Sequence, residues 1–178
     1  MFQDEVHFQE QTSITRTWAE KGSEPKVMSK PGRKKVSYSG FVIPETGELV
    51  VTKPCWFNYE TVIQSLREFI EAKPCHDGKR YCIILDNAPW HKKAIRLIWT
   101  EEHDEYADIR EKLDYLSLPP YSPDLNPIQV WRKTRREKTH NRYFGVLSKL
   151  TEVLDTYLGQ FFMPNDQLRS LCSFSCFI

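Results

Sequence analysis

The sequence has almost no net charge, no paired cysteine motif and no long apolar run. Its 25 Lys and Arg residues against 24 Asp and Glu leave a formal net charge of +1, so any affinity for nucleic acid must come from local patches. The five cysteines form no CxxC pair, which argues against a zinc site. No signal peptide or membrane-length apolar segment is present, and we therefore expect a cytoplasmic protein that does not enter a membrane.

Positive charge does gather locally. Residues 26–35 carry several Lys and Arg and no acid, and residues 131–142 carry many of them against the single Glu137. An acidic stretch from Glu101 to Asp114 balances both segments. A run of like charge is often only a solvated surface. Each patch by itself is therefore equally consistent with a solvated face and with a nucleic-acid contact.

Hydrophobic periodicity predicts strands first and then alternating strands and helices. Strands are expected at residues 2–8, 12–18, 36–43, 48–52, 81–85 and 115–118. Helices are expected at residues 58–72, 90–102, 126–141, 147–161 and 165–172, with a helical turn at 108–112. This order indicates one α/β domain over residues 1–178, with a mixed sheet of about five strands flanked by helices. Its motifs lie within residues 2–144, and the C-terminal helices occupy residues 146–172.

Two acids distant in sequence are candidate metal ligands. Asp86 ends the apolar run Tyr81–Leu85, where a buried strand meets solvent, and Asp4 lies in the first predicted strand. A proline-rich loop over residues 118–127 delivers a helix start near the same edge. Carboxylates brought together on rigid elements suit Mg²⁺, which activates phosphodiester chemistry.

The helix after this loop has clear start signals. Asn126 can cap it, Pro127 suits its first position, and Gln129 falls where a capping box places its last member. Asp124 is interpreted as a turn residue, since it follows a proline. The tryptophans are expected to be core anchors: Trp90, Trp99 and Trp131.

Three blocks resemble those of mariner-like and related bacterial insertion-sequence transposases. Asp4-Glu-Val-His-Phe8 with Arg16-Thr-Trp-Ala-Glu-Lys-Gly22 is similar to the first block, Leu85-Asp-Asn-Ala-Pro-Trp-His91 to the second, and Pro119-Pro-Tyr-Ser-Pro-Asp-Leu-Asn-Pro-Ile128 to the third. The blocks occur in the family's order. The resemblance implies a ribonuclease H-like DDE catalytic core that cleaves and joins DNA at transposon ends with two Mg²⁺ or Mn²⁺ ions. It also implies that Asp4 and Asp86 are the first and second catalytic aspartates.

The third catalytic position departs from the family's pattern. The family usually reads Asn-Pro-Ile-Glu, two residues, then Trp, whereas this chain reads Asn126-Pro-Ile-Gln-Val-Trp131. Either Glu has become Gln129 with a further residue lost, or the Glu is deleted and Gln129 is its old neighbour. A deletion here rotates the rest of the helix by about 100°, so the helix keeps either the Trp131 pocket or the Asn126 entry. Gln129 could still offer a neutral oxygen. We expect one metal ion or none, and little catalysis.

Other expectations come from the same resemblance. The family carries helix-turn-helix modules ahead of the core, so we expect no sequence-specific DNA recognition by this chain alone. Only Met1-Phe-Gln3 precedes Asp4, so we expect a truncated first strand. The expected partners are transposon-end and target DNA, with a homodimer or a pairing with full-length transposase, in the bacterial nucleoid. The residues expected to contact DNA phosphates are His91, Lys92, Lys93, Arg132, Lys133 and Arg136.

Two classes of function therefore stay open. The first is the catalytic domain of a DNA transposase whose activity is impaired in this copy. The second is a decayed, non-catalytic core that binds DNA or pairs with an intact transposase. A nuclease acting on RNA–DNA hybrids is less favoured, because the segment Ser122–Pro127 belongs to the transposase pattern.

Overall fold

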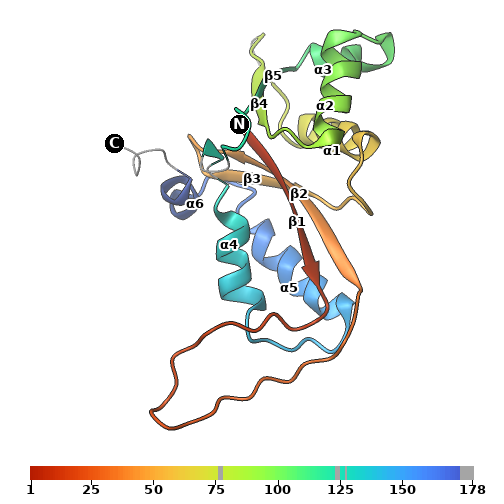
Figure 1. The fold of residues 1–178 in the computed structure, drawn as a ribbon. Coiled ribbons are helices and arrows are strands. Elements are labelled where there is room, and N and C mark those ends of the chain that lie inside the picture. The colour runs from red at the N-terminus through yellow and green to blue at the C-terminus, as the bar shows by residue number, and fades with distance from the viewer. Residues whose placement is uncertain (76–77, 123–124, 127, 173–178) are drawn as a thin grey trace.

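The computed structural model describes residues 1–75, 78–122, 125–126 and 128–172. These residues form a five-stranded sheet in the order β3-β2-β1-β4-β5 (Figure 1). Its strands are β1 (Phe2–Gln9), β2 (Lys35–Ile43), β3 (Glu48–Thr52), β4 (Tyr81–Leu85) and β5 (Leu113–Ser117). β1, β2 and β3 are antiparallel neighbours, whereas β4 runs parallel to both β1 and β5. The predicted mixed sheet is confirmed.

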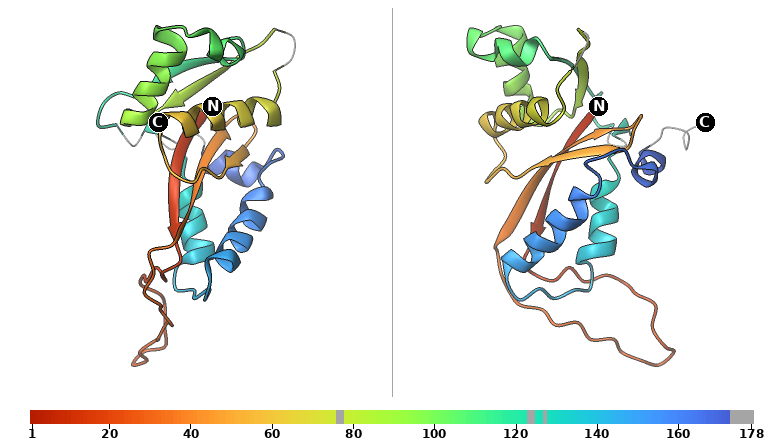
Figure 2. Two further views of the ribbon diagram at one scale, coloured as in Figure 1. Left: turned by 90° about the vertical axis from the view of Figure 1, so that its right-hand side faces the viewer. Right: turned by 180° about the vertical axis from the view of Figure 1, so that it is seen from behind.

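Helices cover both faces of this sheet. On one face lie α1 (Tyr59–Ala72), α2 (Pro89–Ile95) and the short α3 (Ala107–Arg110). On the other lie α4 (Val130–Thr134), α5 (Leu147–Gly159) and α6 (Asp166–Leu171). Figure 2 shows α4 and α5 packed along the β1–β2 pair. Each layer encloses its own apolar cluster, and the three tryptophans predicted as core anchors pack against these clusters.

β1 sends alternate side chains into the two layers. Phe2, Val6 and Phe8 join the apolar cluster beneath α5, and Asp4 shares their face of the strand. The residues between them, including Glu5, face α1 and α2 instead. A single strand thus supplies polar groups to both sides of the sheet.

The ladder in the middle of the sheet is short. β1 is eight residues long and pairs with β2 throughout. Within the described sheet it pairs with β4 in register only at Phe2 and Ile84. The Met1 amino group extends this contact by donating to the Cys82 carbonyl at 2.8 Å, and the Met1 carbonyl accepts from the Ile84 N–H at 2.9 Å.

Residues 12–18 do not form the predicted strand, although the structure describes all of them. Ser13 makes one isolated bridge to His140, and residues 10–34 run as a long loop away from the sheet (Figure 1). The prediction was wrong because residues 12–18 pair with no strand of the described sheet. Ile14 and Trp18 find no apolar surface to cover and are 70% and 100% exposed.

Two predicted long helices are interrupted by wider turns. α2 gives way to a π-helical turn at Arg96–Thr100, and α4 gives way to one at Arg135–Thr139. The His140 N–H donates to the Arg135 carbonyl at 2.8 Å, a bond spanning five residues. A π turn holds one more residue than an α turn, so it shifts the helical phase of the residues beyond it. Among the described helices, none has the length and apolar character needed to cross a membrane.

Candidate active site

The three residues predicted to be catalytic line one cleft of about 700 Å³. Asp4 comes from β1, Asp86 directly follows β4, and Gln129 directly precedes α4. The loop from Leu118 to Ser122 forms a further wall. Three segments far apart in sequence therefore present oxygen-bearing side chains to the same space.

Among the described residues, the contacts that anchor Asp86 are made through one of its carboxylate oxygens. Its Oδ1 accepts the Ala88 N–H at 2.9 Å and lies 2.5 Å from Nδ1 of His91. The hydrogen bond from His91 lowers the pKa of Asp86, so this carboxyl is ionised at neutral pH. Oδ2 makes no hydrogen bond with a described residue, and the side chain is 49% exposed. Oδ2 is therefore free to bind a ligand in the cleft.

Asp4 is more deeply buried and less well compensated. Its Oδ1 accepts the N–H of Glu5 at 2.9 Å. Burial raises the pKa of Asp4 to about 7, and the nearby charges of Glu5 and Asp86 add to the rise. A half-buried acid that faces a second acid is a position where a bound cation favours the ionised form.

Gln129, the residue predicted at the third catalytic position, lines the same cleft as Asp4 and Asp86. Its side chain makes no hydrogen bond with a described residue, and its amide oxygen is a neutral ligand. Among the described residues, no three His, Cys, Asp or Glu side chains form a group that could hold a metal ion. The two carboxylates with the amide oxygen are hard oxygen donors, which fit one divalent cation. The two carboxylates supply two negative charges, whereas the family's pattern of three acids would supply three.

The start of α4 differs from the prediction. Regular helix begins at Val130 without a side-chain cap from the described residues, and the Asn126 Oδ1 accepts the Ile128 N–H at 3.2 Å instead. Trp131 is 5% exposed and packs directly on Gly40 of β2. Of the two alternatives, the chain retains the Trp131 pocket. This outcome is expected because burial of an indole stabilises the fold by roughly several kcal/mol, whereas a helix N-cap contributes about 1 kcal/mol.

Two residues of this entry, Asp124 and Pro127, lie outside the described residues. The predicted turn at Asp124 and the predicted first helical position of Pro127 are therefore left as predictions.

The predicted phosphate-binding cations fall into different environments. Lys92 and Arg132 are exposed and line the cleft beside the two acids. Arg136 is exposed on the π turn that follows α4 and does not line the cleft. Lys92 and Arg132 are therefore the cations best placed to meet a phosphate at the site.

Two of the predicted cations already have partners. The Lys93 Nζ lies 3.6 Å from the centre of the Tyr59 ring, a cation–π contact. The Lys133 Nζ lies 2.5 Å from Oε1 of Glu137, and its side chain is only 11% exposed. Their positive charges are largely committed within the chain.

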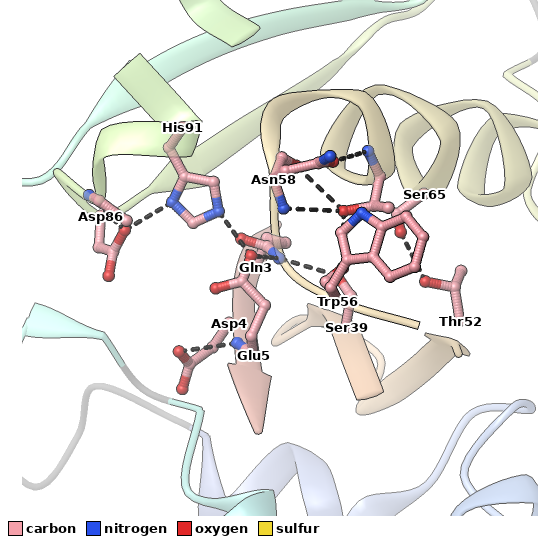
Figure 3. Close-up of polar contacts among 12 residues, drawn as sticks. Gln3, Asp4, Glu5, Ser39, Thr52, Trp56, Asn58, Ser65, Asp86 and His91 are labelled. Atoms are coloured by element: carbon pink, nitrogen blue, oxygen red, sulfur yellow. Dashed lines mark hydrogen bonds and ion pairs between the residues drawn. The ribbon is translucent and has the colours of Figure 1, made fainter. Parts of the chain in front are cut away.

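His91 does not lie at the mouth of the cleft. It is fully buried, with Nδ1 2.5 Å from Oδ1 of Asp86 and Nε2 2.7 Å from Oε1 of Glu5 (Figure 3). Burial alone would lower the pKa of His91, but the hydrogen bonds to the two carboxylates raise the pKa to about 9. The predicted phosphate contact is wrong for this arrangement, because both ring nitrogens already face carboxylates.

Glu5 is not among the predicted site residues, because it points away from Asp4. The signal that could have found it is the strand alternation itself, which directs Glu5 toward the helix layer that contains His91. Sequence alone does not show how that layer is aligned with β1.

The family model of the DDE superfamily endonucleases matches residues 1–151. This chain belongs to that family. No curated protein sequence matches the chain significantly.

Solved structures of Mos1 share the fold of this DDE endonuclease chain. The Mos1 strand transfer complex matches with a TM-score of 0.61 at 18% identity over 96% of this chain. The Mos1 mariner paired end complex with Mn matches with a TM-score of 0.62 at 18% identity over 94%, and the complex with Mg with 0.57 at 17% over 96%. This chain spans about half of each solved chain, 50%, 49% and 51% respectively. At such identity the likeness confirms the ribonuclease H-like fold.

Proposed function

We propose that this chain is the catalytic core of a DNA transposase, which cleaves DNA at transposon ends and joins it to a target. Its activity is reduced because Gln129 stands in place of the third acid. The observation that carries this proposal is the convergence of Asp4, Asp86 and Gln129 on one cleft of a DDE endonuclease fold. One Mg²⁺ or Mn²⁺ ion is expected here.

A divalent cation held at this site would polarise the scissile phosphate and promote ionisation of the attacking hydroxyl. Oδ2 of Asp86 and the carboxylate of Asp4 are the groups that would hold it. Asp4 must first lose its proton, since its pKa is about 7. Lys92 and Arg132 line the same cleft as the acids and would bind phosphates of the DNA backbone, which positions the DNA without reading its sequence.

A second function, a binding module without catalysis, is favoured by the shortage of acids. Among the described residues that line the cleft, two are carboxylates, and the exposed Lys92 and Arg132 line it with them. Such a core would bind DNA or pair with an intact transposase. The paired-end assemblies of Mos1 support transposon-end DNA as the ligand of this chain, and a homodimer or a pairing with full-length transposase as its assembly. The bacterial nucleoid is the location that this proposal implies.

Insertion of Glu between Ile128 and Gln129 tests the catalytic proposal. The parent and the insertion variant are incubated with Mg²⁺ or Mn²⁺ and a supercoiled plasmid that carries the element's ends, and nicking is measured. We expect the insertion variant to nick at least about 100-fold faster, because loss of even an outer partner of a metal ligand costs 10–100-fold. Addition of Asp86→Asn to the insertion variant should abolish this gain.

The outcomes separate the two functions. Equal nicking by the parent and the insertion variant would show that our interpretation of position 129 is wrong. If neither protein nicks and both bind DNA with strong salt dependence, the binding module is the better description. Nicking that survives Asp86→Asn would remove Asp86 from the mechanism.

A further inference from the structure

A chain of hydrogen-bonded side chains runs from the cleft into the layer beneath α2 (Figure 3). It begins at Asp86, whose Oδ1 lies 2.5 Å from His91, and continues from His91 to Glu5 at 2.7 Å. The side-chain amide nitrogen Nε2 of Gln3 then donates two hydrogen bonds, to Oε1 of Glu5 at 3.0 Å and to Oγ of Ser39 at 2.8 Å. The chain thus links a residue at the cleft to the far face of β1 and β2.

The inner members of this chain are shielded from solvent. His91 is 0% exposed, Gln3 and Ser39 are each 2% exposed, and the Glu5 side chain is 8% exposed. Charged groups are costly to bury, and apolar residues of similar volume often give equal or greater stability. Core stability alone therefore does not account for an ionic pair at this position.

The geometry at Asp86 suggests what the buried pair does. Oδ1 is held from two directions, by the Ala88 N–H and by His91. The carboxylate cannot rotate without loss of both contacts, and Oδ2 is left facing the cleft. His91 in turn cannot swing away, because Glu5 holds its other nitrogen. Ligand groups are commonly oriented by partners of this kind behind them.

We propose that Glu5 and His91 are positioning residues for the metal-binding carboxylate of Asp86. Glu5 orients the imidazole, His91 anchors Oδ1, and Oδ2 is thereby presented to a divalent cation in the cleft. The adjacent acids of β1 then have separate roles on opposite faces: Asp4 acts within the cleft, and Glu5 acts from behind the sheet. This inference rests on the proposed function, since it requires that Asp86 binds the cation.

Binding of Mn²⁺ to the purified protein tests the inference without any catalytic assay. Free Mn²⁺ is quantified by electron paramagnetic resonance for the parent, Glu5→Ala and Glu5→Gln. Glu5→Ala should weaken Mn²⁺ affinity by about 10–100-fold, the usual effect of removing an outer partner. Glu5→Gln should stay within about threefold of the parent, because its amide oxygen can still accept from Nε2 of His91.

Glu48 offers a matched control in β3. Its side chain is 14% exposed and its Oε1 lies 2.5 Å from Nζ of Lys73, and it does not line the cleft. Glu48→Ala should lower the melting temperature and leave Mn²⁺ affinity unchanged. If Glu5→Ala does not fold, Glu5→Leu fills the vacated space and still leaves His91 without its acceptor, so the same 10–100-fold loss is expected.

The double variant Asp4→Asn/Asp86→Asn separates failure of this inference from failure of the proposed function. If the double variant binds Mn²⁺ as tightly as the parent, the cation does not bind these acids, and both proposals fall. If the double variant loses Mn²⁺ while folded Glu5→Ala or Glu5→Leu keeps the parent affinity, only the positioning role is overturned. The positioning role is also overturned if Glu48→Ala weakens binding as much as Glu5→Ala does.

Discussion

The two neighbouring acids of β1 have opposite electrostatic environments. Glu5 faces the imidazole of His91 at 2.7 Å, so its negative charge has a partner. Asp4 faces the cleft, where burial raises its pKa to about 7. Such uncompensated charge is common at functional sites, where activity takes precedence over stability. Asp4 therefore destabilises the metal-free fold at neutral pH.

Asp4→Asn is expected to stabilise the metal-free protein at neutral and alkaline pH. Between the ordinary pKa of 3.8 and the raised value of about 7, the folded protein keeps a proton that the unfolded chain has released. The stability of the parent therefore falls as pH rises through this range. In urea unfolding, the variant should match the parent near pH 4 and exceed it by up to about 4 kcal/mol near pH 8. An equal gain at both pH values would contradict this assignment.

At the scale of elements, the docking of Trp131 decides where α4 lies. A Cβ atom on Gly40 would stand 2.4 Å from the Trp131 ring, so the contact requires glycine at that position of β2. With Trp131 held there, Gln129 precedes the helix. The π turn at Arg135–Thr139 then shifts the helical phase of the residues beyond Thr139. The position of Gln129 in the cleft is thus set by a contact two residues away.

Gly40→Ala should displace Trp131 and lower the free energy of unfolding by about 1–3 kcal/mol, the usual cost of overpacking a core. Gly159 of α5 provides the control, since a Cβ there meets nothing within 4 Å and its φ is not positive. Gly159→Ala should raise the free energy of unfolding by up to about 1 kcal/mol. Urea denaturation measures both changes. A Gly40→Ala protein as stable as the parent would exclude the tight Trp131 contact.

At the scale of the whole molecule, charge is distributed unevenly despite a net charge of only +1. Lys92 and Arg132 border the acidic site, whereas Lys133 is neutralised by Glu137. The basic segment at residues 26–35 lies in the loop that projects from the sheet, except for Lys35, which begins β2 (Figure 1). DNA affinity should therefore depend on a few local phosphate contacts and be sensitive to salt.

The double variant Lys92→Ala/Arg132→Ala should reduce the slope of log affinity against log salt concentration. Loss of two phosphate contacts predicts a decrease in the slope of about 1.8 for duplex DNA. Lys133→Met should leave the slope unchanged, because Glu137 already binds the Lys133 ammonium group. Fluorescence anisotropy with a labelled duplex at several salt concentrations gives these slopes. An unchanged slope in the double variant would move the DNA path away from this cleft.

Local pattern was enough to predict much of the fold. The helix at residues 58–72 follows from its apolar stripe, and its cap at Asn58 forms a reciprocal capping box with Thr61. The strands at residues 36–43, 48–52 and 81–85 follow from short apolar runs between turn residues. Periodicity and caps depend on near neighbours in the chain, so they can be read without the tertiary structure. The expectation that Asp4 and Asp86 are the two catalytic aspartates of one site came instead from the resemblance to a family.

Only the tertiary structure decided which polar groups face the cleft and which lie behind it. His91 follows Asp86 by five residues, yet packing of α2 on the sheet buries it against Glu5. Residues 12–18 alternate like a strand, yet they pair with no strand of the described sheet, and Ile14 and Trp18 stay exposed. The sequence predicts that Lys133 binds phosphate, but in the structure its ammonium group forms an ion pair with Glu137. Contacts of this kind depend on how separate elements align in space, which local sequence pattern does not specify.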